Sequence, residues 1–197
     1  MTELVVKSFS HLLLSWGGVA FAAVIGILLG ILLTRVPVLS GPVLGLSEIL
    51  QTVPSLAMLA ILMMTFGLGD TTAIMAIFLY SLLPIVRNTY TAIRGVDAAL
   101  LEAARGMGMS KLQMLLQVEL PNALPLILSG IRVSLITAYG IVTIAVLVGG
   151  GGLGGYIYRG TQTADTAMVL MGAIPICAMA VGTDFLLNRL ERKMIRR

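Results

Sequence analysis

A run of glycines is the first place in this sequence where residue type and spacing could do chemistry. Gly150, Gly152 and Gly155 fit the G-x-G-x-x-G spacing, which in dinucleotide-binding units lets a loop approach a pyrophosphate. That chemistry needs a preceding β-strand, whereas these glycines follow a long apolar run, and no Gly-Lys-Ser/Thr comes after them. Nucleotide binding is therefore not expected here, and a flexible loop or close packing of backbones explains the run better.

Catalytic and metal-binding patterns are equally hard to find in the sequence. His11 has no second ligand nearby and is expected at an interfacial position, and Cys177 is the single cysteine. One cysteine allows neither an intrachain disulfide nor a cysteine-based metal cluster. No nucleophile, base and orienting group occur in a recognisable arrangement. We therefore expect no catalytic residue, no metal site and no enzymatic activity in this chain.

Polar residues around a proline are better candidates for a functional site. The set is Glu48, Gln51, Thr52, Pro54 and Ser55. Polar groups at membrane depth usually face a bundle interior or a water-filled path, so we expect these residues to line a pathway. The alternative is that Glu48 lies near the interface and meets headgroups or Arg35. Arg132 also lies within an apolar run, and a structural pair with a carboxylate or carbonyl is favoured over a substrate contact.

The composition places these residues in a membrane protein. The 197 residues are 58% hydrophobic and only 11% charged, whereas soluble domains carry about 25% charged residues. A helix needs roughly 20 apolar residues to cross the bilayer, and the apolar runs are continuous, as in helices, rather than alternating, as in barrel strands. Five spans are predicted within a single domain covering residues 1–197. They cover about residues 12–34, 43–66 with a kink at Pro54, 71–90, 124–148 and 167–188.

The distribution of basic residues predicts the orientation. With the C-terminus in the cytoplasm, ten of the thirteen Lys and Arg residues lie inside and only Lys7 and Arg159 lie outside. Five of the ten lie between Arg189 and Arg197, which indicates membrane topology rather than binding to nucleic acid. We therefore expect the N-terminus outside and the C-terminus in the cytoplasm.

The segment of residues 91–121, predicted between the third and fourth spans, has the pattern of two short helices. Asp97 can cap the first helix, and Gly108 can take the left-handed conformation that ends it. Leu100, Leu101, Ala104 and Met107 have helical spacing on one face. Ser110 and Gln113 have the spacing of a capping box at the start of the second helix. The segment is expected to be a rigid, amphipathic projection into the cytoplasm.

At these residues the chain resembles the membrane subunits of ATP-binding-cassette importers. Their signature is Glu-Ala-Ala, three residues, Gly, nine residues, an aliphatic residue, one residue and Leu-Pro. This sequence has Glu102-Ala103-Ala104, then Gly108, then Val118, and finally Leu120-Pro121. The resemblance implies an all-α membrane protein with five transmembrane helices and the MetI-like fold of type I importer permeases.

The resemblance also implies a role and partners. The loop would be the coupling helix that docks on an ATPase subunit, through Glu102, Ala103, Ala104, Arg105, Gly106, Met107, Gly108, Leu120 and Pro121. The expected partners are two ATPase subunits that bind ATP and magnesium, a second permease subunit, identical or not, and a separate substrate-binding protein. This chain would then need no cofactor, and it would lie in the inner membrane of a bacterium. The alternative reading of the loop is an interfacial helix that packs on lipid headgroups.

Further stretches resemble the osmoprotectant branch, which takes up glycine betaine, carnitine and choline. They are Gln51-Thr52-Val53-Pro54-Ser55-Leu56-Ala57, residues 80–89, Val118-Glu119-Leu120-Pro121, Gly130-Ile131-Arg132 and residues 150–154. A permease for another small solute such as methionine is the nearest alternative. An ion-coupled secondary transporter is disfavoured because the spans lack an acidic relay, and a membrane scaffold without transport activity is the last alternative.

Overall fold

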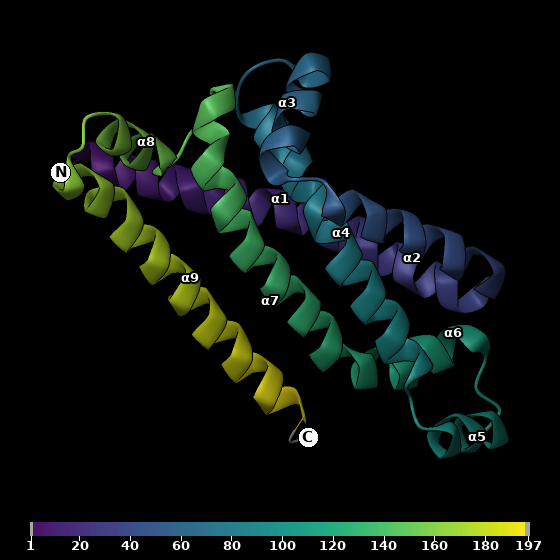
Figure 1. Cartoon of the computed structure of the whole chain (residues 1–197). Coiled ribbons are helices and arrows are strands. Elements are labelled where there is room, and N and C mark those ends of the chain that lie inside the picture. The colour runs from purple at the N-terminus through teal and green to yellow at the C-terminus, as the bar shows by residue number, and fades with distance from the viewer. Residues whose placement is uncertain (1, 196–197) are drawn as a thin grey trace.

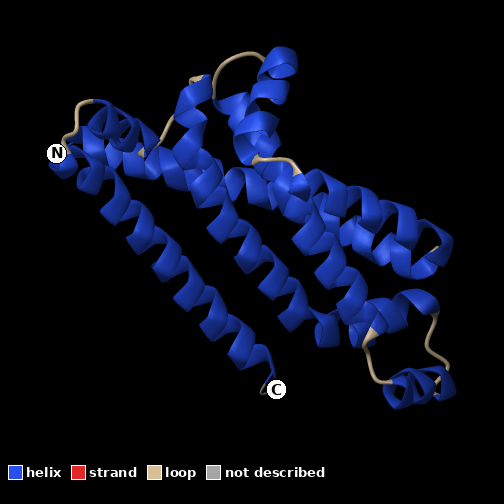
Figure 2. Ribbon diagram, in the orientation of Figure 1, coloured by secondary structure: helices blue, strands red, loops and turns tan. Residues whose placement is uncertain are grey.

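The computed structural model describes residues 2–195, and this part of the chain is helical with short connections (Figures 1 and 2). The α-helices are α1 (Thr2–Arg35), α2 (Pro37–Thr52), α3 (Ser55–Phe66), α4 (Asp70–Arg94), α5 (Ala98–Gly106), α6 (Lys111–Met114), α7 (Leu120–Ala145), α8 (Gly154–Gln162) and α9 (Thr166–Ile195). A π-helical turn, Leu115–Glu119, joins α6 to α7, and a 3₁₀ turn, Val146–Val148, follows α7. Arg196 and Arg197, two of the five cations that predict the orientation of the C-terminus, lie outside the described residues.

Four continuous helical stretches in the described residues are long and apolar enough to cross a membrane. They are Thr2–Arg35, Asp70–Arg94, Lys111–Val148 and Thr166–Met194. The pair α2 and α3 makes a fifth if it counts as one broken span. Several helices extend beyond the predicted apolar ranges: α1 begins at Thr2 rather than near residue 12. Hydropathy marks only the lipid-facing length, whereas a helix continues wherever its backbone hydrogen bonds do.

A stripe of small residues packs α1 closely against α4. Gly18, Ala22, Gly26 and Gly30 recur every four residues along α1, and all four are buried. A Cβ atom added at Gly18 would lie 2.6 Å from Ile77, and one added at Gly30 would lie 2.5 Å from Thr89. Small residues at this spacing let two helix backbones approach each other inside a membrane. This stripe fixes α4, which supplies one wall of the candidate site.

The second predicted span is broken rather than kinked. Helices α2 and α3 meet at an angle of 102°, with Val53 and Pro54 between them. Pro54 has no N–H to donate, and Val53, which precedes it, has the extended conformation that proline imposes (φ −67°, ψ 126°). Two successive residues thus leave the helical conformation, and α3 turns across α4 instead of continuing α2 (Figure 1).

Helix α9 is the most loosely held of the long helices. It packs on α7 and α8, yet only 11% of its apolar window is buried. Arg132 of α7 lies 3.6 Å from Asp184 and 3.7 Å from Glu191, both on α9. The predicted structural pairing of Arg132 with a carboxylate is confirmed, and these ion pairs join α7 to α9.

Candidate functional site

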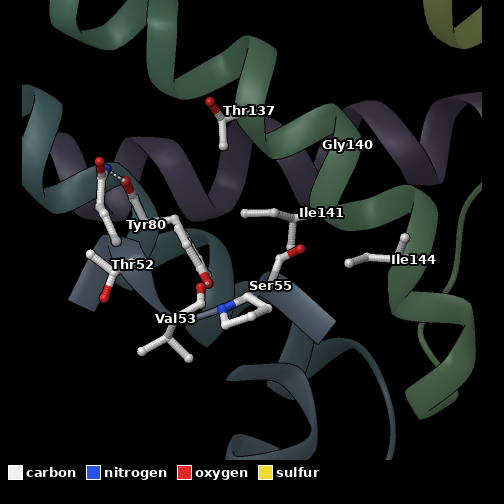
Figure 3. Close-up of a pocket in the computed structure, with 10 residues that line it drawn as sticks. Thr52, Val53, Ser55, Tyr80, Thr137, Gly140, Ile141 and Ile144 are labelled. Carbon is white, nitrogen blue, oxygen red and sulfur yellow. Dashed lines mark hydrogen bonds between the residues drawn. The ribbon is translucent and has the colours of Figure 1, made fainter. Parts of the chain in front are cut away.

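A cavity lies where α2 and α3 part. Its volume is about 480 Å³, and one side of it is open (Figure 3). Its lining consists of Gln51, Thr52, Val53, Pro54 and Ser55 from the break, Tyr80 from α4, and Thr137, Gly140, Ile141 and Ile144 from α7. The proline break creates the space, because a continuous helix through residues 52–55 would fill it. Broken helices are a recurrent way to expose polar backbone at membrane depth.

Tyr80 holds the break in place. Its hydroxyl donates a hydrogen bond to the carbonyl oxygen of Val53, and its own carbonyl accepts one from the side-chain amide of Gln51 at 2.9 Å. A carbonyl freed by a proline is costly in an apolar surrounding unless a donor reaches it. Tyr80 and Gln51 therefore stabilise the bent geometry from both sides, and Figure 3 shows the side chain of Tyr80 reaching the break at Val53.

Four of the five residues predicted for a pathway line this cavity, but the fifth does not. Gln51, Thr52, Pro54 and Ser55 belong to the wall. Glu48 lies one helical turn before it and forms an ion pair with Arg87 of α4 at 3.1 Å. The alternative pairing of Glu48 with Arg35 is wrong, because Arg35 pairs with Glu119 instead.

No strong sequence signal marks the other residues that line the cavity. Tyr80 looks like an ordinary aromatic residue of an apolar helix, and Thr137 and Gly140 lie in a continuous apolar run. Their contribution depends on the angle at which α7 passes the break. The one sequence signal was that Thr137 and Gly140 share a helix face at i, i+3, which is a common spacing.

Helix α5 projects from the body, and its ends are held by local interactions (Figure 1). Asp97 accepts a hydrogen bond from the backbone N–H of Ala99 at 2.9 Å, so the predicted cap is confirmed. At the other end Gly108 has φ +76°, and Met109 donates to the carbonyl of Ala104 at 3.1 Å. This is the Schellman arrangement, which requires a left-handed residue and favours glycine.

The residues predicted to share one face of α5 differ in burial. Ala104 is buried, but Leu100 and Met107 are 47% and 72% exposed. Leu100 and Met107 lie four and three residues from Ala104, so all three lie on one side of the helix, and the body covers only part of that side. Glu102, Ala103, Arg105, Gly106 and Gly108 are also exposed. The outer surface of α5 thus presents large apolar side chains beside charged ones, which is typical of a surface that a partner covers.

The second short helix is continuous with α7 and is not a separate element. The predicted capping box of Ser110 and Gln113 is confirmed, and it begins a helix that runs to Val148. Leu120 and Pro121, predicted at the end of the loop, therefore lie inside this helix. Pro121 cannot donate a backbone hydrogen bond, and the π turn just before it accommodates the missing donor. Residues 111–148 thus form one continuous helix, and α5 joins it through the turn of residues 107–110.

An ion pair anchors the base of this helix. Glu119, in the π turn, is buried, and its carboxylate accepts a hydrogen bond from the guanidinium of Arg35 at the end of α1. A buried carboxylate is stable only when it is paired, so Glu119 depends on Arg35. Glu119 is the unspecified residue between Val118 and Leu120 in the signature, and 84 residues separate it from Arg35, so its role could not be predicted from the motif.

The glycine-rich segment, residues 149–155, is packed against the rest of the protein. Leu153 donates to Nδ1 of His11, and Nε2 of His11 bonds to the carbonyl of Tyr139, both at 3.2 Å. His11 is fully buried, so its predicted interfacial position is wrong. A Cβ at Gly154 would lie 2.0 Å from the carbonyl oxygen of Thr143. Of the two explanations for these glycines, the contacts favour close packing of backbones over a flexible loop.

Comparison with known proteins agrees with this geometry. A family model described as "Binding-protein-dependent transport system inner membrane component" matches residues 12–196. Within the described residues, no group of three or more His, Cys, Asp or Glu could hold a metal ion.

Two curated relatives come from Bacillus subtilis. The chain is 51% identical over 187 residues to the glycine betaine/carnitine/choline transport system permease protein OpuCD, covering 94% of this chain and 82% of that protein. It is 42% identical over 192 residues to the permease protein OpuCB, whose name gives the same solutes, covering 98% and 88%. Among solved structures, an inward-facing MetNI methionine ABC transporter matches with a TM-score of 0.87 at 24% identity, covering 98% of this chain and 97% of that one, which shows the fold. The chain therefore belongs to the family of inner membrane components of binding-protein-dependent transport systems.

Proposed function

We propose that this chain is the permease subunit of an ATP-binding-cassette importer for quaternary-ammonium osmoprotectants such as glycine betaine, carnitine and choline. The observation that carries the proposal is the 51% identity with OpuCD over 94% of the chain. An open cavity of about 480 Å³ at a broken helix supports it, because transport of a small solute needs a space between the helices at membrane depth. A separate binding protein delivers the solute, and the pathway includes Gln51, Thr52, Pro54 and Ser55.

Helix α5 is proposed as the coupling helix. Its exposed residues, Glu102, Ala103, Arg105, Gly106, Met107 and Gly108, dock on an ATPase subunit, while buried Ala104 holds the helix to the body. Leu120 and Pro121 carry the motion into α7, with which α6 is continuous. ATP and magnesium bind to the ATPase, and this chain requires no cofactor for that role.

A second permease chain completes the pathway. Thr52, Thr137 and Gly140 are exposed on the open side of the cavity, and hydroxyl groups at membrane depth face protein or water rather than lipid. The two relatives OpuCD and OpuCB come from one organism and share the solutes in their names. The partner is accordingly a sister chain or a second copy, and each of the two permeases presents one α5 to one of two ATPase subunits.

The proposed orientation places α5 and the C-terminus in the cytoplasm and the N-terminus outside. Arg35, Arg94, Arg105 and Lys111 all lie near the end of the bundle that carries α5. Positive charge is retained on the cytoplasmic side of bacterial inner membranes, which is where we place this protein.

Uptake by the intact assembly tests this proposal. The tagged full-length chain is purified from its native membranes together with its bound subunits, and is reconstituted into liposomes with the binding protein. We expect labelled glycine betaine to accumulate with ATP but not with ADP, and an ionophore that collapses ion gradients to have no effect. Accumulation of methionine but no quaternary-ammonium solute would refute the substrate class. ATP-independent uptake driven by an ion gradient would refute the importer mechanism.

A further inference from the structure

The ion pair between Glu48 and Arg87 has an unusual setting for charged groups in membrane-spanning helices. The carboxylate of Glu48 on α2 lies 3.1 Å from the guanidinium of Arg87 on α4, and the two side chains are 53% and 60% exposed. Charged groups facing hydrocarbon are costly, so an open pair in spanning helices faces water or protein instead. The side of the molecule that carries this pair therefore does not face the hydrocarbon of the membrane.

The pair lies next to the cavity, on the side toward α5. Glu48 precedes Thr52 of the cavity wall by one helical turn, and Arg87 follows Tyr80 by seven residues. Seven residues of helix correspond to about 10 Å. Because α4 runs from the cavity toward α5, a solute that leaves the cavity for the cytoplasm passes Glu48 and Arg87 next.

The other ion pairs of residues 2–195 differ in accessibility. In these pairs one member is closed by the protein: Glu119 is 7% exposed although Arg35 is 46% exposed, and Arg132 is 22% exposed although Asp184 is 44% exposed. These pairs are partly closed by the protein, as expected for structural links. Both members of the Glu48–Arg87 pair remain open to a third group.

The chemistry of an open carboxylate beside an open guanidinium matches a zwitterion. A carboxylate attracts a quaternary ammonium group, and a guanidinium binds a carboxylate through two parallel hydrogen bonds. Glycine betaine and carnitine carry both groups, whereas choline carries only the ammonium. We propose that Glu48 and Arg87 form a passage site for zwitterionic solutes, and that Arg87 favours carboxylate-bearing osmolytes over purely cationic ones.

The Glu48–Arg87 site should bind its solute only weakly. The two residues already neutralise each other, and water reaches both, so a solute gains only the difference between two sets of contacts. A pathway site must release its solute as readily as it accepts it. This inference rests on the proposed function, since it assumes that quaternary-ammonium solutes use the pathway.

The test compares two solutes in one assay. Uptake of glycine betaine and of choline is measured in liposomes containing the intact assembly, with the wild-type chain, Arg87→Gln or Glu48→Gln. We expect Arg87→Gln to lower the ratio of betaine to choline uptake by about tenfold, which corresponds to a net difference of about 1.4 kcal/mol between the two solutes. Glu48→Gln should lower the uptake of both solutes, because both carry the ammonium group.

Arg94→Gln is the matched control. It removes the same charge from the last residue of the same helix, and it should leave the ratio unchanged. If Arg87→Gln does not assemble, Arg87→Lys is the second variant, because it keeps the charge but loses the bidentate hydrogen bonds of the guanidinium. We expect Arg87→Lys to lower the ratio of betaine to choline uptake by about threefold.

The assay separates a failure of the proposed function from a failure of the inference about Glu48 and Arg87. A wild-type assembly that takes up neither solute refutes the proposed function. A wild-type assembly that transports both, with Arg87 variants that reduce both equally, shows a structural ion pair and overturns the inference.

Discussion

The glycine-rich segment and α5 lie at opposite ends of the molecule, and they are held in different ways (Figure 1). The segment is fixed by distant residues: Gly151 donates to Asp70 of α4 at 2.6 Å, and Leu153 donates to His11 of α1. The turn around α5 is held mainly by its own caps at Asp97 and Gly108. One end is thus part of the packed body, whereas the other is a projection held mainly by its own hydrogen bonds.

Glycine serves the two ends for different reasons. At Gly154 the missing Cβ makes room for the backbone of α7, and at Gly108 it permits a positive φ with nothing within 4 Å of the Cβ position. The first requirement is steric and the second is conformational. A substitution at Gly154 should therefore lower thermal stability, whereas one at Gly108 should impair transport, and this difference tests the comparison.

Gly154→Ala should have the largest effect on stability. Its Cβ would lie 2.0 Å from the carbonyl oxygen of Thr143, and backbone cannot rotate away as a side chain can. Such overpacking costs about 3 kcal/mol. Thermal unfolding of the detergent-solubilised protein measures the loss. Gly155→Ala is the control, because its nearest neighbour, Val146, lies at an ordinary contact distance of 3.8 Å. Equal melting temperatures for the two variants would contradict the packed segment.

His11→Phe should have the next largest effect. The ring stacks on Tyr139, and its two nitrogens serve Leu153 and the carbonyl of Tyr139. Phenylalanine keeps a ring but leaves the buried N–H of Leu153 without its acceptor, whereas the carbonyl of Tyr139 keeps the hydroxyl of Thr143; the loss costs about 2 kcal/mol. His11→Gln, whose side-chain carbonyl oxygen can replace Nδ1 as the acceptor, should recover part of the loss. The same thermal measurement checks both variants, and a Gln variant no more stable than the Phe variant would argue against the hydrogen bonds.

The two ends also differ in how far sequence alone could predict them. Asp97, Gly108, Ser110 and Gln113 act within a few residues of themselves, so their caps could be identified from local spacing. His11 bonds to residues 128 and 142 positions away, which no local pattern reveals, and its environment was predicted wrongly. Isolated polar residues acquire their roles from the packing of distant helices.

The candidate site shows the same division. Pro54 and the polar residues beside it indicated a break, because proline acts on its own backbone. The angle of 102° and the wall supplied by Tyr80 and Thr137 depend on how α3, α4 and α7 pack. The four-residue spacing of Gly18, Ala22, Gly26 and Gly30 is visible in the sequence and indicates close packing of α1 on another helix, but it does not indicate which one.

Gly108→Val should have the smallest effect on stability but a large effect on transport. Valine strongly disfavours φ +76°, yet α5 is exposed, so the strain of roughly 1 kcal/mol is relieved by local rearrangement rather than by unfolding of the body. The altered turn would misplace Leu100 and Met107 relative to α6. We therefore expect normal membrane insertion, a nearly unchanged melting temperature, and ATP hydrolysis that no longer drives uptake. Gly182→Val, the same substitution at a helical position of α9 with open space around its Cβ, is the control and should transport normally. Full transport by Gly108→Val would mean that transport does not depend on the orientation of α5. The structural contrast between the glycine-rich segment and α5 would then have no functional consequence.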